Sequence, residues 1–162
     1  MKTKIGITGS HGFIGSHLAK ALEKSGKYDL ALLDHKHCDL LDVKSLKSFV
    51  SGRDVIFHIA GANRDTNVNL IRINVIGTLN LLEAIKHYGK KNIKFIFISS
   101  VQVYTPSFTN SAFREEDLNL FSDTIFGLSK ITAENLVNLY DIDSIIFRLS
   151  NAYGPYSKPF YN

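Results

Sequence analysis

The sequence predicts an α/β fold, in which a parallel β-sheet of about five strands carries helices on both faces. Short apolar runs alternate with longer segments of helical periodicity along the 162 residues, and this alternation is typical of α/β proteins. The apolar runs are also nearly unbroken, as expected for strands that are buried on both faces. Because 44% of the residues are hydrophobic, we expect one domain over residues 1–162 with a single core.

Five apolar runs are the expected strands, at Lys4–Thr8, Asp29–Leu33, Asp54–Ile59, Ile93–Ser99 and Ser144–Leu149. Helices are expected between them, at Gly12–Lys24, Val43–Val50, Val68–Tyr88 and Ser122–Tyr140. In the third helix the apolar residues form one broad stripe, made by Leu70, Ile73, Leu81, Leu82 and Ile85. The segment Tyr104–Leu120 is rich in Ser and Thr and is expected to be a loop at the carboxyl edge of the sheet.

Composition and charge exclude several kinds of function. The chain has 19 Lys and Arg against 15 Asp and Glu, but the basic residues are scattered, so no nucleic-acid partner is expected. No apolar run reaches the roughly 18 residues that a membrane span needs, so no membrane contact is expected either. Cys38 is the single cysteine, which fits a cytoplasmic location. His35, His37 and Cys38 lie close together, but no second ligand pair follows and no metal site is expected.

A glycine-rich turn follows the first strand and leads into an apolar helix; it reads Gly9-Ser10-His11-Gly12-Phe13-Ile14-Gly15. Glycines in this order let the backbone turn tightly and let a pyrophosphate approach the amides at the helix N-terminus. Asp34 ends the second strand 19 residues after Gly15, where a carboxylate can accept hydrogen bonds from ribose hydroxyls. The other interpretation of Asp34 is an ordinary turn residue. NAD is therefore the expected cofactor, and NADP stays open because His35 and Lys36 could attract a ribose phosphate.

This turn and five later segments resemble the extended short-chain dehydrogenase/reductases, the NAD-dependent epimerase/dehydratase family. The later segments are Asp39-Leu40-Leu41-Asp42, His58-Ile59-Ala60-Gly61-Ala62, Asn74 with Gly77-Thr78, Ser99-Ser100 with Val103-Tyr104, and Arg148–Asn151 with Tyr153-Gly154-Pro155. The resemblance implies a Rossmann-type doubly wound sheet and hydride transfer at a carbon of a nucleotide-linked sugar, by an epimerase, dehydratase or reductase. It implies cofactor contacts from the glycine turn and from Asp39, Leu40, Ala60, Gly61, Ala62 and Lys130, and substrate contacts from Ser100 and Asn151.

The resemblance also implies a catalytic serine, tyrosine and lysine, of which two are present. Ser100 matches the serine and would hydrogen-bond the substrate oxygen, and Lys130 matches the lysine and would bind the nicotinamide ribose. The tyrosine position, four residues before Lys130, holds Phe126, which cannot exchange a proton. The phenylalanine is an introduced change, a natural loss, or a sign that another base acts, for which Tyr104 is the nearest candidate. The alternative function is a non-catalytic dinucleotide-binding or interaction module.

Size and assembly are further expectations from the resemblance. The chain is shorter than family members, so the carboxy-terminal substrate region is expected to be largely absent. The short stretch Asp34–Asp42 leaves no room for the family's usual third strand and its helix, which predicts a smaller sheet. The helices at 68–88 and 122–140 are expected to pair with a second copy in a homodimer, and His58 is expected to be buried and neutral. In the plainest interpretation Lys130 is a surface lysine near Glu134, and Ser100 a turn residue.

Overall fold

A computed structural model describes residues 1–33, 39–104 and 120–156 of the chain. Within these residues one sheet holds five strands: β1 (Thr3–Thr8), β2 (Tyr28–Leu32), β3 (Val55–His58), β4 (Lys94–Ser100) and β5 (Asp143–Leu149). They are all parallel, in the order β2-β1-β3-β4-β5. The chain thus winds from β1 to β2 on one side and then to β3, β4 and β5 on the other. The doubly wound parallel sheet is confirmed, and its switch point lies between the carboxyl ends of β1 and β3.

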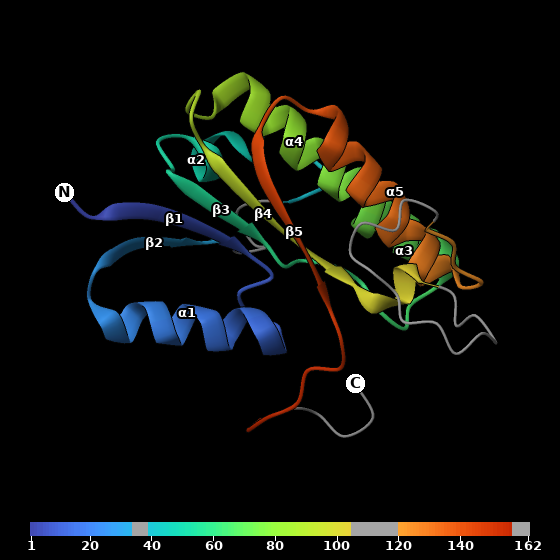
Figure 1. The fold of residues 1–162 in the computed structure, drawn as a ribbon. Helices are drawn as coiled ribbons and strands as arrows, with labels where there is room; N and C mark the ends of the chain where they lie inside the picture. The colour runs from blue at the N-terminus through green and yellow to red at the C-terminus, as the bar shows by residue number, and fades with distance from the viewer. Residues whose placement is uncertain (34–38, 105–119, 157–162) are drawn as a thin grey trace.

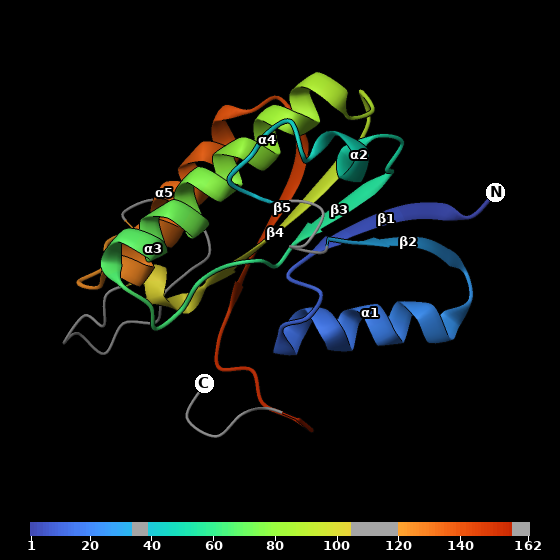
Figure 2. The ribbon, with the colours of Figure 1, turned by 180° about the vertical axis from the view of Figure 1, so that it is seen from behind.

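Helices cover both faces of this sheet, as Figures 1 and 2 show. α1 (Phe13–Ser25) lies on one face, and α2 (Lys47–Val50), α4 (Gly77–Tyr88) and α5 (Ile125–Leu139) lie on the other. A short helix, α3 (Asn67–Ile71), joins α4 through a single wide π-turn, η1 (Arg72–Ile76). A 3-10 turn, η2 (Val101–Val103), follows β4 at the carboxyl edge.

Each face has its own apolar cluster. Under α1, Ala19 packs with Ile5 and Ile7 of β1. The larger cluster lies under α4 and α5 and includes the rings of Phe95 and Phe97. Four members of the predicted stripe are buried on this side, namely Leu70, Leu81, Leu82 and Ile85. Burial of such side chains stabilises the fold by about 1.5–3 kcal/mol each, so these two clusters hold the helices against the sheet.

The two faces are covered unequally, which corrects the expectation that the strands are buried on both sides. Along β4, buried residues alternate with half-buried ones, and on β5 the side chains of Ile145 and Phe147 are 38% and 47% exposed. The partners of α1 in its cluster come from β1, β2 and β3. Among the described residues, one helix on that face is too narrow to cover β4 and β5, and no sequence pattern indicates how far a helix reaches across a sheet.

The predicted helix at Val43–Val50 is wrong at its start, since α2 begins only at Lys47. The preceding residues form successive tight turns, with hydrogen bonds from Ser45 N to Asp42 O and from Leu46 N to Val43 O. The Ser45 hydroxyl also bonds to the backbone of Asp39 and Asp42. A serine side chain that occupies backbone groups in this way competes with a regular helix.

Helix α5 begins three residues later than predicted. The hydroxyl of Thr124 accepts a hydrogen bond from Gly127 N at 3.0 Å and caps the helix. The hydroxyl of Ser122 accepts from Thr124 N, so Ser122 lies in the turn before the cap. A threonine N-cap of this kind satisfies one of the unpaired amides of the first helical turn.

The helical run Asn67–Tyr88 is long and apolar enough, with a mean hydropathy of 1.3, to meet the length and composition criteria for a membrane-spanning helix. Counting consecutive apolar residues did not indicate this. Half of the window that meets the criteria is buried in the fold, where Leu81, Leu82 and Ile85 pack in the larger cluster. A core helix of this kind passes the same test.

Candidate cofactor and catalytic site

The glycine turn after β1 is tight at two of its three glycines. Gly9 has a φ of +68°, and Gly12 N donates to Gly9 O at 3.0 Å. A Cβ at Gly9 would lie 2.6 Å from Ala60 N, and a Cβ at Gly15 would lie 2.1 Å from Gly9 O. Any larger residue would therefore push the turn away from β3 or from the first turn of α1.

The start of α1 suits an anion. Gly12 is the N-cap and makes no side-chain cap, and the first turn carries no acidic residue. The first amides of a helix have no partner within the helix, and the helix dipole adds partial positive charge there. His11 is exposed beside the turn, whereas Ser10 is buried. The residues present therefore fit the pyrophosphate of a dinucleotide.

The threonine that ends β1 ties the glycine turn to the loop after β3. Thr8 Oγ1 accepts hydrogen bonds from the amides of Ile59 and Ala60, both at 3.1 Å. Because both lone pairs are then used, its own proton is donated to His58 Nδ1, 2.8 Å away. Thr8 therefore connects the glycine turn after β1 to the loop after β3, the two segments on either side of the switch point.

His58 is neutral and carries its proton on Nε2. Thr78 Oγ1 lies 2.9 Å from this nitrogen but already donates its own proton to Asn74 O at 2.7 Å, so His58 must be the donor. Burial, with a smaller effect from the charge of Lys130, lowers the pKa of His58 to about 3. The expectation of a buried, neutral histidine is confirmed.

Asn74, in the π-turn, fixes the position of the loop after β3. Its Oδ1 accepts from Ala62 N at 2.7 Å, and its Nδ2 donates to Ala62 O at 3.0 Å. The same Nδ2 donates to Ser129 Oγ on α5 at 2.9 Å. This buried amide joins the loop to the helix that carries Lys130, and Ser129 is a supporting residue that the sequence analysis missed.

Lys130 lies directly beneath the exposed backbone of Gly61. Its side chain is buried, with 6% of the residue exposed, and Nζ donates to Ile98 O at 2.9 Å. A Cβ at Gly61 would lie 3.3 Å from Nζ. Burial lowers the pKa of Lys130 to about 8, against the opposing charge of Glu134. The interpretation of Lys130 as a surface lysine is therefore wrong. Its Nζ uses one N–H for the bond to Ile98 O, so its other N–H groups can donate to a ligand beside the loop after β3.

The two serines at the end of β4 have different partners. Ser99 is buried and donates to Glu134 Oε1 at 2.5 Å. Ser100 is half-buried, and its hydroxyl accepts from Gln102 N at 3.2 Å. The proton of Ser100 is not used by that bond, so Ser100 and not Ser99 can still donate to a ligand oxygen.

Residues 5–162 match the family described as the NAD dependent epimerase/dehydratase family. The chain belongs to this family. It is 32% identical to a UDP-N-acetyl-alpha-D-glucosaminuronate decarboxylase of Bacillus cytotoxicus over 98% of this chain and 57% of the relative. The chain therefore spans about half the length of the relatives that it matches.

Solved structures of two proteins show the same fold with a nucleotide cofactor. The UDP-glucuronic acid 4-epimerase of Bacillus cereus in complex with NAD has a TM-score of 0.80 and 29% identity, over 97% of this chain and 58% of that one. It was also solved as a tyrosine-to-phenylalanine mutant with UDP-4-deoxy-4-fluoro-glucuronic acid and NAD, with a TM-score of 0.74, 28% identity and coverage of 90% of this chain and 56% of that one. The RMD protein of Pseudomonas aeruginosa with NADPH has a TM-score of 0.81 and 30% identity, over 97% of this chain and 56% of that one.

Phe126, at the position where the sequence analysis expects a tyrosine, lies in the first turn of α5. It is half-buried and precedes Lys130 by one helical turn, so both can serve one face of the helix. Tyr104, the other phenol considered, accepts a hydrogen bond from Arg148 Nη1. That hydroxyl is already held by a charged donor from β5.

The remaining predicted contacts are dispersed. Leu40 is buried beside Gly77 of α4, Asp39 is an exposed turn residue whose Oδ1 accepts from Leu41 N, and Asn151 is exposed after β5. Asp34, with His35–Cys38, lies outside the described residues, as does most of the predicted loop after Tyr104. Over the described ranges no three His, Cys, Asp or Glu side chains gather as a metal site would need.

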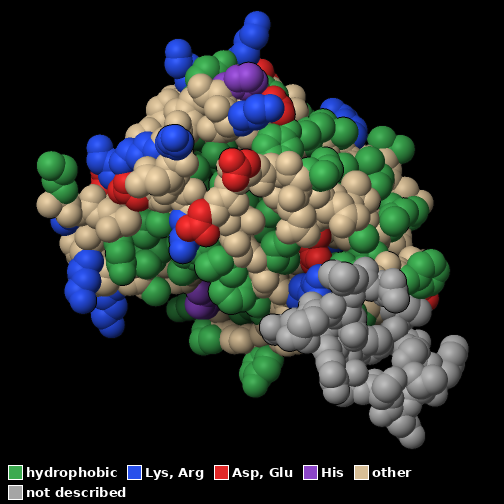
Figure 3. Space-filling view, turned by 45° about the horizontal axis from the view of Figure 1, so that its top comes forward, with side chains coloured by type: hydrophobic (Ala, Val, Ile, Leu, Met, Phe, Trp, Pro, Cys, Tyr) green, Lys and Arg blue, Asp and Glu red, His purple; other side chains and the backbone are tan. Residues whose placement is uncertain are grey.

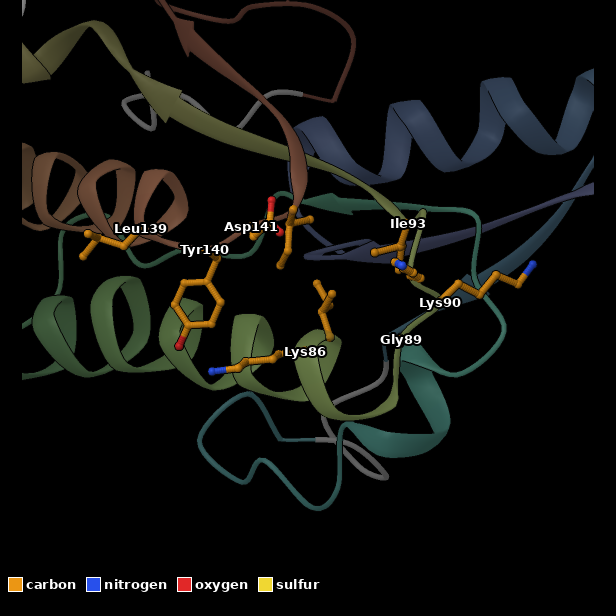
Figure 4. Close-up of a pocket in the computed structure, with 10 residues that line it drawn as sticks. Lys86, Gly89, Lys90, Ile93, Leu139, Tyr140 and Asp141 are labelled. Atoms are coloured by element: carbon orange, nitrogen blue, oxygen red, sulfur yellow. The ribbon is translucent and has the colours of Figure 1, made fainter.

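A separate pocket lies at the opposite end of the sheet (Figure 4). It is formed where α4 and α5 end and β4 begins, between residues that include Lys86, Gly89, Ile93 and Tyr140. Its apolar floor is part of the larger cluster, through Ile85 and Ile93. Since ligands in doubly wound sheets bind at the carboxyl ends of the strands, this pocket is distinct from the site.

Proposed function

We propose that this chain is the cofactor-binding portion of an NAD(P)-dependent enzyme that transfers a hydride at a carbon of a nucleotide-linked sugar. The observation that carries the proposal is one juxtaposition at the carboxyl edge of the sheet. There the glycine turn after β1, the exposed Gly61 after β3 and the buried Nζ of Lys130 meet around the switch point. A doubly wound fold binds dinucleotides at this place.

The cofactor is NAD, with NADP as the variant that the same fold accepts. The amides at the start of α1 would hold the pyrophosphate, the backbone of Ala60–Ala62 would line the cofactor, and Lys130 would donate to the nicotinamide ribose. When bound, the nicotinamide supplies the acceptor for the hydride. Family relatives solved with NAD and with NADPH support both forms.

The substrate is a nucleotide-linked sugar. Relatives named for such compounds, a decarboxylase and an epimerase of UDP-sugars, support this class. Ser100 would hydrogen-bond the substrate oxygen with the proton that Gln102 leaves free, and Asn151 would contact the substrate from the segment after β5. The single cysteine supports a reducing, cytoplasmic location.

Cofactor binding is tested by a pair of glycine substitutions with the same backbone strain. Gly9→Ala is expected to weaken NADH binding at least about tenfold, because a Cβ there meets Ala60 N at 2.6 Å and displaces both loops at the switch point. Gly26→Ala is the matched control, since Gly26 has a φ of +66° and a Cβ added there would meet nothing within 4 Å. The measurement is titration of each protein with NADH and NADPH by fluorescence. No saturable binding of either dinucleotide to the unaltered protein, or equal loss in both variants, would refute the assignment.

We also propose a homodimer through the helical runs at 68–88 and 122–140, supported by exposed apolar side chains in both. Leu128 and Leu139 of α5 are 46% and 80% exposed, and Ile76, just before α4, is 42% exposed. Leu128→Asp is expected to convert a dimer to a monomer of 18.1 kDa, measured by light scattering after size exclusion, because a charge would be buried at the interface. Leu32→Asp is the control, at 39% exposure on β2 at the far edge of the sheet. A monomeric unaltered protein would end this proposal.

Basic side chains do not suggest a different partner. In Figure 3, Lys and Arg side chains are spread over the visible face, with Asp and Glu between them, and do not gather in one patch. Nucleic-acid interfaces have a clustered basic stripe or patch. The net charge of +4 is compatible with an anionic small molecule.

A further inference from the structure

An ion pair between a buried carboxylate and a half-buried arginine connects three elements next to the site. Glu134 of α5 is 2% exposed and accepts from Arg148 of β5, with Nε at 3.1 Å from Oε1 and Nη2 at 2.8 Å from Oε2. The same carboxylate accepts from Ser99 of β4. These hydrogen bonds raise the pKa of Arg148 above its ordinary value, so the guanidinium stays charged.

The guanidinium of Arg148 also bonds to Tyr104, the residue after the η2 turn that Ser100 begins. Arg148 Nη1 donates to the hydroxyl of Tyr104, and its Cζ lies 5.0 Å from the centre of the Tyr104 ring. Tyr104 N in turn donates to Val101 O at 3.0 Å and closes η2. Ser100 is the N-cap of this turn through its bond from Gln102 N. One arginine thus connects the carboxylate of α5 to the end of the turn that Ser100 begins.

Stability alone gives a poor account of this arrangement. Removing two charges from water is costly, and a well-packed apolar replacement is often as stable as a buried ion pair. What the pair adds is direction, because a carboxylate and a planar guanidinium bond in a fixed, two-point geometry. The adjoining strand and helix already pack through Phe95, Phe97, Ala133 and Val137.

We infer that Arg148 and Glu134 are positioning residues, which hold η2 through Tyr104 and so fix the hydroxyl of Ser100 relative to Lys130. Glu134 lies one helical turn after Lys130 on α5, and its bond to Ser99 fixes that helix against β4, whose Ile98 carbonyl accepts from Lys130. The two candidate catalytic groups are therefore held by one carboxylate. The value of this for catalysis rests on the proposed function, but the positioning itself does not.

The test removes the Tyr104 hydroxyl and reads the turn directly. In Tyr104→Phe, hydrogen exchange measured by NMR is expected to speed up about tenfold at the amides of Gln102 and of position 104, the effect of one lost hydrogen bond. The amides of Phe95 and Phe97 in β4 are expected to keep their rates. Arg148→Lys keeps the positive charge but removes the planar guanidinium that bonds to Glu134 and Tyr104 together. It is expected to speed up hydrogen exchange at the same two amides.

Tyr140→Phe is the matched control. It removes a phenol hydroxyl that also bonds to a charged group, the carboxylate of Glu83, at the other end of α5. It is expected to leave η2 unchanged. Unchanged exchange at η2 in Tyr104→Phe, or an equal increase at η2 and along β4, would overturn the inference. Because these rates are read without a cofactor, failure to bind NADH would count against the proposed function and not against the positioning pair.

Discussion

Phe126→Tyr is expected to raise the rate of hydride transfer by about 10²–10⁴-fold, the usual contribution of one positioned acid–base group. The substitution adds a hydroxyl one helical turn before Lys130, whose amine is buried and carries a pKa lowered to about 8. A phenol close to that ammonium has its phenolate form favoured and can accept the proton of a substrate hydroxyl. Ser100, the candidate donor to the substrate oxygen, lies at the end of β4.

The measurement compares both proteins with NAD and UDP-glucuronic acid, following the absorbance of the reduced nicotinamide. Phe121→Tyr is the matched control, because it adds the same hydroxyl at a residue that is 65% exposed. A spectrophotometric titration of the added phenol gives a second result that needs no substrate, namely a pKa below that of the phenol added at position 121. If Phe126→Tyr binds NADH but gains neither turnover nor a lowered phenol pKa, the non-catalytic binding module becomes the better account.

Acidification is expected to destabilise the fold through His58, by about 1.4 kcal/mol per pH unit between about pH 6.5 and pH 3. The folded protein does not protonate His58 until its pKa of about 3 is reached, whereas the unfolded chain protonates it near 6.5. Between these values the unfolded state binds more protons, so the free energy of unfolding falls as the pH falls. The whole effect amounts to about 5 kcal/mol.

Urea unfolding at a series of pH values measures this slope. His58→Gln is expected to lower stability at neutral pH, because its amide cannot span both Thr8 and Thr78, but to flatten the slope by the stated amount. His87→Gln controls for histidine loss, since His87 is exposed and pairs only at the surface with Glu83. Carboxylates with lowered pKa values, such as Asp54 and Asp65, contribute equally in all three proteins. Equal slopes in the unaltered protein and His58→Gln would contradict the assignment of a neutral His58.

Local patterns were enough to predict the strands and the glycine turn, whereas Lys130 was singled out by the resemblance to the family. Alternation between apolar runs and helical periods depends on neighbours in the sequence, and both ends of each predicted strand were found within one residue of the expected bounds. Gly9 and Gly15 could be predicted because only a residue without a side chain permits such close backbone contacts.

The supporting polar network could not be predicted, because its partners are distant in sequence. Asn74 meets Ser129 across 55 residues, and Thr8 meets His58 across 50. A clue was present in the form of polar residues within apolar stripes, since Asn74, Glu134 and Arg148 all interrupt otherwise hydrophobic faces. A polar residue in an apolar stripe indicates that it has a hydrogen-bond partner. It does not identify that partner, because which side chains come together depends on the order of the strands in the sheet.

The wide turn η1 changes how the third helical run should be read. Gly77 N donates to Arg72 O, five residues back, so one extra residue is accommodated there. The extra residue shifts the angular position of every later side chain around the helix axis. A single helical wheel drawn from Asn67 through Tyr88 therefore assigns residues before and after η1 to the wrong faces relative to each other. The insertion allows Asn74 to face the loop after β3 while Thr78 faces His58, and deletion of one residue from η1 would turn one of these two contacts away from its partner.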